Sequence, residues 1–257
     1  MAFNETLFAS HMAQGVGLQA VGEHRLALDV RLEAHGMAPE GSLEQGRAAR
    51  DVSASYDKLD DLGAAGPWAQ KAYQIHDRLV ETAGADVQAT IAAARERSVS
   101  AMYVGINGLR RYAHGRRDGK THEQLQEQAD SAVIMMRLTW SDLCAVRELS
   151  GRRQPVDQYE INAARRVSVA ESLFGSHGKG LRIAGRAVLI ALRSESRSLP
   201  TSSSEMSTRS RLVAKRNAMI GGLAAVAVGL TAWGDTLRRH VALPIAERFV
   251  LGSRRTS

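Results

Sequence analysis

The sequence predicts an all-α protein, and three observations support this. The 257-residue chain is 44% apolar but only 5% aromatic, whereas β-sheets favour aromatic and β-branched side chains. It contains only five prolines, which break helices. Apolar residues recur at steps of three and four, and two such stretches begin with capping boxes, Ser42–Gln45 and Thr121–Gln124. We expect an N-terminal antiparallel helical bundle, a basic amphipathic helix, a Ser-rich linker and one C-terminal apolar helix that is a candidate transmembrane span.

Residues 5–35 are expected to form one weak or bent helix, because three glycines interrupt its first half. Leucine and valine alternate with polar residues over 26–32, which leaves a strand as the alternative. The capping box at Ser42 predicts a second helix that ends by Gly63. Pro67 is then expected at the first position of a third helix, where its missing N–H costs nothing.

The remainder of the bundle, which we assign to residues 1–150, contains two longer helices. One is expected from Ala85 to about Tyr112, weakened by two glycines, and the other from Thr121 to Gly151. The latter is the clearest amphipathic helix, and its apolar stripe is assigned to packing: Leu125, Ala129, Ala132, Met136, Trp140 and Leu143. Between the two helices a short basic loop is expected.

Residues 151–197 form a basic helical extension in this interpretation. A helix is expected from about Asp157 to Phe174, then a glycine-rich break over 175–180, then a helix over 181–197. The arginines of the last helix fall on one stripe: Arg182, Arg186, Arg193 and Arg197. A basic amphipathic helix suits an anionic membrane surface, and the alternative is a core helix with one solvated arginine face.

The C-terminal part begins with a Ser/Thr-rich linker over 198–210 and continues with an apolar helix and a basic amphipathic tail over 211–257. The segment 217–234 contains no charged residue and would be about 27 Å long as a helix, slightly less than a bilayer core. Basic residues precede it (Arg209, Arg211, Lys215 and Arg216), and two follow it, Arg238 and Arg239.

Within this apolar segment, Gly221, Ala225 and Gly229 are four residues apart, and Trp233 lies near its end. Small residues at this spacing let a second helix approach closely. We therefore expect these four residues to serve membrane insertion or helix packing. The excess of basic residues before the segment mildly favours a cytoplasmic body.

The charge is divided unevenly. Residues 1–149 hold 16 Lys/Arg and 20 Asp/Glu, a net −4, and residues 150–257 hold 18 and 7, a net +11, which together give the +7 of the whole chain. A basic half attracts phosphate, whether from lipid headgroups or nucleic acid. The single cysteine excludes an intrachain disulfide, and the first residues do not form a signal or transit peptide.

No motif predicts a cofactor or a metal. Gly15–Ala20 matches a loose dinucleotide fingerprint without a preceding strand, and 175–180 lacks the spacing of a phosphate loop. Gln126 occupies the position where a His-Glu-x-x-His zinc site needs its second histidine. We expect no catalysis, although a site assembled only by the fold is left open.

The basic loop is the best local candidate for contact with phosphate or nucleic acid. Its candidate residues are Arg110, Arg111, Tyr112, Arg116, Arg117 and Lys120, and an aromatic ring between arginines can stack on a base. An ordinary solvated loop is the alternative.

Taken together, these features favour a membrane-associated helical scaffold or interaction protein, held at the cytoplasmic face by one C-terminal span. Its partners would be an anionic lipid surface and a protein partner or a second copy of the chain. The alternative is a soluble cytoplasmic all-helical protein with a buried Gly/Ala-rich helix, whose basic half binds nucleic acid or an acidic partner.

Overall fold

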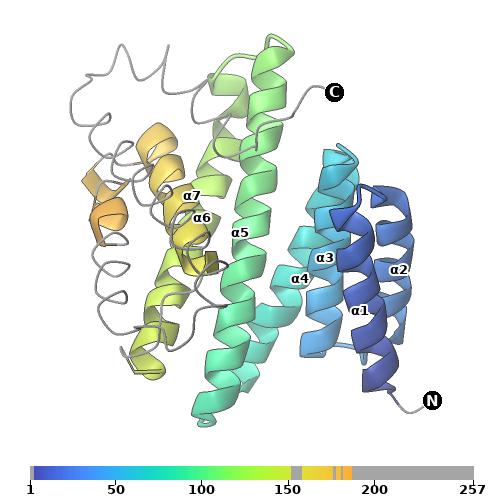
Figure 1. Ribbon diagram of the computed structural model, residues 1–257. Coiled ribbons are helices and arrows are strands. Elements are labelled where there is room, and N and C mark those ends of the chain that lie inside the picture. The colour runs from blue at the N-terminus through green and yellow to red at the C-terminus, as the bar shows by residue number, and fades with distance from the viewer. Residues whose placement is uncertain (1–2, 152–157, 176–177, 181, 187–257) are drawn as a thin grey trace, which may run out of the picture. The chain divides into compact units, whose positions relative to one another are not determined.

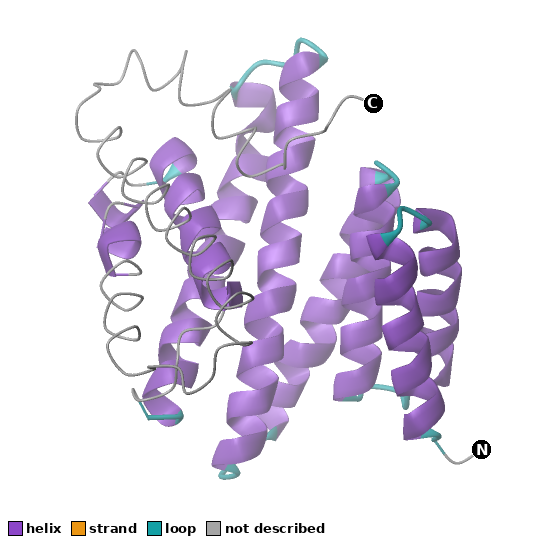
Figure 2. Cartoon of the chain, viewed as in Figure 1, coloured by secondary structure: helices purple, strands orange, loops and turns teal. Residues whose placement is uncertain are grey.

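The computed structural model describes residues 3–151, 158–175, 178–180 and 182–186. Within these ranges every regular element is a helix (Figure 2), so the predicted all-α class is confirmed for this part of the chain. The chain divides into two compact units, Met1–Ser150 and Gly151–Ser257.

The first unit consists of helices that each pack against the next one along the chain (Figure 1). Their bounds are α1 (Glu5–Ala20), α2 (His24–Met37), α3 (Leu43–Lys58), α4 (Leu62–Thr82), α5 (Val87–Arg117), the 3₁₀ turn η1 (Glu123–Leu125) and α6 (Gln126–Leu149). The connections are short, so successive helices run antiparallel. Helix α3 also contacts α5.

The predicted capping box at Thr121 is confirmed in both of its bonds, and the one at Ser42 in the bond to the cap side chain. Ser42 Oγ accepts from Gln45 N at 3.1 Å, while Gln45 Oε1 accepts from the N–H of Gly41, one residue before the cap, at 2.8 Å. Thr121 and Gln124 exchange both bonds, with Gln124 N to Thr121 Oγ1 at 3.2 Å and Thr121 N to Gln124 Oε1 at 2.8 Å. These bonds satisfy backbone donors that a helix start otherwise leaves unpaired.

The N-terminal stretch differs from its prediction as a single helix over 5–35. It forms two helices, α1 and α2, because the chain turns at Gly22 with φ +88°. A glycine adopts this left-handed conformation without the steric cost of a side chain. The alternating residues 26–32 are helical, so the alternative of a strand is wrong.

Helix α4 begins five residues before Pro67, and the prediction of this proline at the first helical position is therefore wrong. Asp61 caps the helix by accepting from Ala64 N at 2.9 Å. Proline has no N–H to donate to the carbonyl four residues earlier, and that carbonyl, of Gly63, is 3.5 Å from Arg111 Nη2. The same guanidinium donates to Leu62 O at 2.9 Å, so α5 supplies donors to the first turn of α4.

Small residues let the helices of this unit approach closely. Alanines on several helices are completely buried: Ala27, Ala34, Ala48, Ala49, Ala69, Ala72, Ala101 and Ala129. Gly105 weakens α5 as an isolated helix, but a Cβ there would lie 2.9 Å from Met136 Cε and 3.2 Å from the Ala132 carbonyl oxygen of α6. Its missing side chain is therefore what allows α5 and α6 to touch. The predicted packing stripe of α6 is buried except for half-buried Trp140.

Ion pairs cross the helix contacts of α5. Arg97 donates to both oxygens of Asp142 on α6, at 2.8 and 2.7 Å, and to Asp77 on α4 at 2.7 Å. The hydrogen bond to Asp142 is the main cause that raises the pKa of Arg97, and burial opposes it. Arg110 forms ion pairs with Asp57 and with Asp60, the latter at 3.1 Å, at the end of α3.

In the second unit, α7 (Gln158–Phe174) matches the helix expected from about 157 to 174. Its buried residues include Ala163, Ala164 and Val167. Residues 178–180 and 182–186 are also helical. Helical backbone is therefore already present at 178–180, within the stretch that was expected to be a glycine-rich break.

The two carboxylates that flank Arg97 differ in exposure, which predicts unequal effects of their removal. Asp142 is 6% exposed and Asp77 is 33% exposed. We expect Asp142→Asn to lower the free energy of unfolding by about 3 kcal/mol, because it leaves a largely buried guanidinium without its bidentate partner. Asp77→Asn should cost under about 1 kcal/mol, since water reaches that group. Urea denaturation followed by circular dichroism measures both, and equal losses would contradict this assignment.

Candidate functional site

A group of buried and half-buried polar side chains lies where α3, α4 and α5 meet. We call it the His76 cluster: Arg47, Arg50, His76, Glu96 and Ser100. Arg47 and Arg50 are three residues apart on α3, and Glu96 and Ser100 are four apart on α5, so each pair shares one face of its helix. Three helices thereby place one histidine and three charged groups together.

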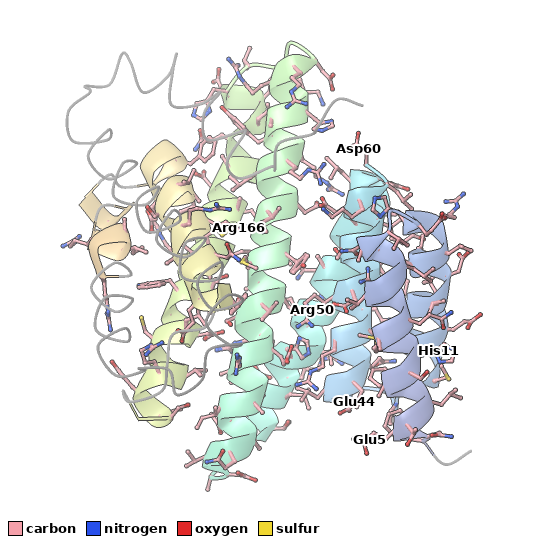
Figure 3. The ribbon with its side chains drawn as sticks, in the orientation of Figure 1. Glu5, His11, Glu44, Arg50, Asp60 and Arg166 are labelled. Atoms are coloured by element: carbon pink, nitrogen blue, oxygen red, sulfur yellow. The ribbon has the colours of Figure 1, made fainter. Side chains whose placement is uncertain are left out.

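Glu96 is the central acceptor of the cluster. Arg47 Nε donates to Glu96 Oε1 at 2.9 Å, and Arg50 Nη1 donates to Glu96 Oε2. Arg50, labelled in Figure 3, also contacts Asp51 at 3.3 Å. Burial raises the pKa of Glu96, but the two guanidinium groups outweigh this and hold it below its usual range. Burial likewise lowers the pKa of Arg50, and Asp51 with Glu96 more than offsets it. Glu96 and Arg50 are therefore both charged at neutral pH.

His76 is completely buried beside this ion-paired network. Its Nδ1 lies 2.9 Å from Ser100 Oγ, and its Nε2 has no hydrogen-bond partner. Burial first, and then the positive charges of Arg50 and Arg47, lower the pKa of His76 to about 4, against the opposing effects of Glu96 and the Leu43 carbonyl. The ring is therefore neutral at pH 7.

Gly46 on α3 lies directly against the His76 ring. A Cβ at this position would lie well inside van der Waals contact with Nε2, and only 2.8 Å from both Cδ2 and Cε1. The unpartnered nitrogen is thus covered by the backbone of α3, and a reactant could reach it only if α3 moved. In this conformation the cluster clamps three helices together.

The basic segment predicted as a loop is helical, because α5 continues to Arg117. Arg110 and Tyr112 lie on its buried side. Arg110 is held by Asp57 and Asp60, and Tyr112 Oη is 3.0 Å from His122 Nδ1 with the two rings edge to face. A buried tyrosine ring cannot stack on a base, so the loop interpretation of this pair is corrected.

The other predicted basic residues remain at the surface. Arg111 is exposed, although its guanidinium donates to the carbonyls at the start of α4. Arg116, Arg117 and Lys120 are exposed around the turn that follows α5, and Arg116 Nη1 donates to Lys120 O at 2.9 Å. A contact of these residues with phosphate stays a prediction.

The C-terminal candidates are described only in part. Arg182 and Arg186 are exposed, with Arg182 Nε donating to Gly178 O at 3.2 Å, and Ala184 between them is buried. The remaining candidates lie outside the described residues: Arg193, Arg197, Arg209, Arg211, Lys215, Arg216, Gly221, Ala225, Gly229 and Trp233. Where the chain is described, none of its helices has both the length and the hydropathy of a membrane span.

The His76 cluster was missed by the sequence analysis. The signal that could have found it is its spacing, because His76 lies one and four residues after Ile75 and Ala72, which share the buried side of α4. Nothing in the sequence paired Glu96 with arginines that are 46 and 49 residues away. The structure holds no group of three His, Cys, Asp or Glu side chains suited to a metal ion in its described part.

The contact between Gly46 and His76 predicts a specific response to substitution. Gly46→Ala should lower the free energy of unfolding by more than about 2 kcal/mol, because a rigid buried ring blocks the added methyl group. Combining it with His76→Ala should restore part of this loss, since the smaller side chain makes room. Denaturant unfolding of the two single variants and the double variant measures this coupling.

Gly17→Ala is the matched control. It is also a helical glycine, but nothing lies within 4 Å of the added Cβ, so this change should stabilise α1 by about 0.5–1 kcal/mol. If Gly46→Ala behaved like Gly17→Ala, the close contact between α3 and α4 would be refuted.

Comparison with known protein families, with curated proteins and with solved structures finds no match to this chain.

Proposed function

We propose that this protein is a membrane-associated helical interaction protein. Its body, residues 1–150, offers helix surfaces to a protein partner, and its basic C-terminal half holds that body at the cytoplasmic face of a membrane. The observation that carries the proposal is the uncharged segment 217–234 with basic residues on both sides. Lipid is the environment in which a stretch of this length and flanking charge is stable.

Exposed apolar side chains of the body support the role in protein contact. Leu7 and Val16 on α1 are 44% and 58% exposed, Val21 at the following turn is 74% exposed, and Leu26 on α2 is 51% exposed. Helix α1 packs mainly against α2, which leaves much of its surface uncovered. Contact with a partner would remove these apolar side chains from water, which is favourable.

The arginine stripe supports a second attachment to lipid. Arg182 and Arg186 are exposed and one helical turn apart, and basic residues near an anionic membrane contribute about 1 kcal/mol each. Gly221, Ala225 and Gly229 would allow two copies of the apolar segment to pack together in the bilayer. Trp233 would lie near the membrane interface, where tryptophan is enriched.

Charge insertion tests the membrane proposal. Val226→Arg places one guanidinium in the middle of the apolar segment, which costs about 3 kcal/mol in a bilayer. We expect the native chain to stay with the membrane pellet after a carbonate wash and the variant to be released. Fractionation followed by immunoblotting gives the distribution.

Ser203→Arg is the control, because it adds the same charge in the Ser/Thr-rich linker and should leave the chain in the pellet. Release of the native chain by high salt alone would indicate surface attachment through the arginines. A native chain found wholly in the soluble fraction would overturn the proposal.

A second candidate function is binding to nucleic acid, favoured by the exposed basic groups that follow α5. If it is correct, affinity for mixed-sequence oligonucleotides should fall as salt rises, with a slope of about −0.9 per phosphate contact on duplex DNA. Arg116→Gln with Arg117→Gln should reduce that slope by roughly 0.9 for each charge removed. Fluorescence anisotropy over a salt series measures it.

The matched double variant is Arg25→Gln with Arg78→Gln, which removes two exposed charges elsewhere on the body. It should leave the salt slope unchanged. Affinity that does not depend on salt would exclude nucleic acid as the partner.

A further inference from the structure

Three features of the His76 ring together link its protonation to the packing of α3. It is completely buried, it has one ring nitrogen without a hydrogen-bond partner, and that nitrogen faces the backbone of a neighbouring helix at Gly46. Histidine is the side chain whose charge changes between about pH 5 and pH 8. Its position therefore couples a packing contact to proton concentration.

A proton on His76 Nε2 would not fit the closed arrangement. The protonated ring has two N–H donors; Ser100 Oγ can accept from only one of them, and the Leu43 carbonyl favours the second proton by less than burial opposes it. Helix α3 presents Arg47 and Arg50 to the ring, so two cations oppose a third. Helix α5 presents Glu96, but both of its oxygens already accept from those arginines.

We propose that His76 is an acid-sensitive latch that holds α3 against α4 and α5, and that protonation of its Nε2 releases α3. The movement would uncover the buried face of α3, which includes Ala48, Ala49 and Val52. The protein would then expose a new apolar surface in an acidic environment while its other helix contacts persist. This device does not depend on the proposed membrane attachment.

The pH range of the latch follows from the direction of the pKa change. The pKa of His76 falls from 6.5 in an open chain to about 4 in the closed one, so the closed state is fully favoured above about pH 6.5. Below that value the open state gains up to about tenfold per pH unit, and about 300-fold in all once the pH is well below 4. Glu96 titrates at a lower pH than the open His76 ring. Its pKa is below 4.5 in the closed state, so the stability that its ion pairs contribute is lost only as the pH falls through that lower range.

Hydrogen exchange of the full-length chain tests the latch. Mass spectrometry of peptides from α3 at about pH 6.5 and about pH 5, corrected for the intrinsic pH dependence of exchange, gives the opening equilibrium. We expect opening of 43–58 to increase about 15-fold over this interval in the native chain, because the open ring is already half protonated at pH 6.5 and opening then gains up to tenfold per pH unit. In His76→Gln the increase should disappear, whatever the absolute level of protection.

His35→Gln is the control variant. Burial, and then Lys71, lower the pKa of His35 on α2, so this residue also responds to acid, but it lies outside the His76 cluster. The variant should keep the acid response of α3. A response that is lost in His35→Gln and retained in His76→Gln would overturn the proposal.

Direct titration of the native chain decides the matter even if His76→Gln fails to fold. The ring signal of His76 in nuclear magnetic resonance should remain that of neutral imidazole down to at least about pH 5. An ordinary titration near pH 6.5 with α3 still protected would refute the latch.

Discussion

Helix α5 is the element on which the first unit depends, because its charged residues form ion pairs with three neighbouring helices. Glu96 accepts from α3, Arg97 donates to α4 and α6, and Arg110 contacts the end of α3. These groups are largely removed from water, so each neighbour must meet them in one register to avoid a buried unpaired charge. Apolar packing alone tolerates more arrangements.

The ion pairs are needed to fix how the helices align, because the apolar contacts between the helices are made of small residues. Alanine and glycine bring backbones close together but contribute little apolar area each. Gly66 illustrates the compromise: a Cβ there would lie 2.7 Å from Arg111 Nη2, and the guanidinium instead supplies donors to the first turn of α4. The same close approach at Gly46 covers one nitrogen of His76, so the proton affinity of the His76 ring is linked to the packing of α3 against it.

Local chemistry explains which parts of this fold were predictable. Residues close together in the sequence determine the helix caps at Ser42 and Thr121 and the apolar stripe of α6. The structure contains all three features. Pro67 was misplaced because a proline inside a helix is tolerated only with outside donors, and Arg111 is 44 residues further along the chain. The pairing of Glu96 with α3 and of Arg97 with α6 likewise depends on the tertiary arrangement. Tyr112 was predicted at the surface because it lies among arginines in the sequence, but helix α5 places its ring in the interior.

The abundance of buried alanine has a practical consequence for mapping this protein by mutagenesis. A conventional alanine scan passes over Ala48, Ala69 or Ala101 without changing anything, although these are among its most enclosed positions. Substitutions that enlarge these side chains, and exchanges between apolar residues of equal volume, report on the packing of the interior instead. A library in which small residues are replaced by valine or leucine would outline the helix contacts of this chain far better than deletion of side chains.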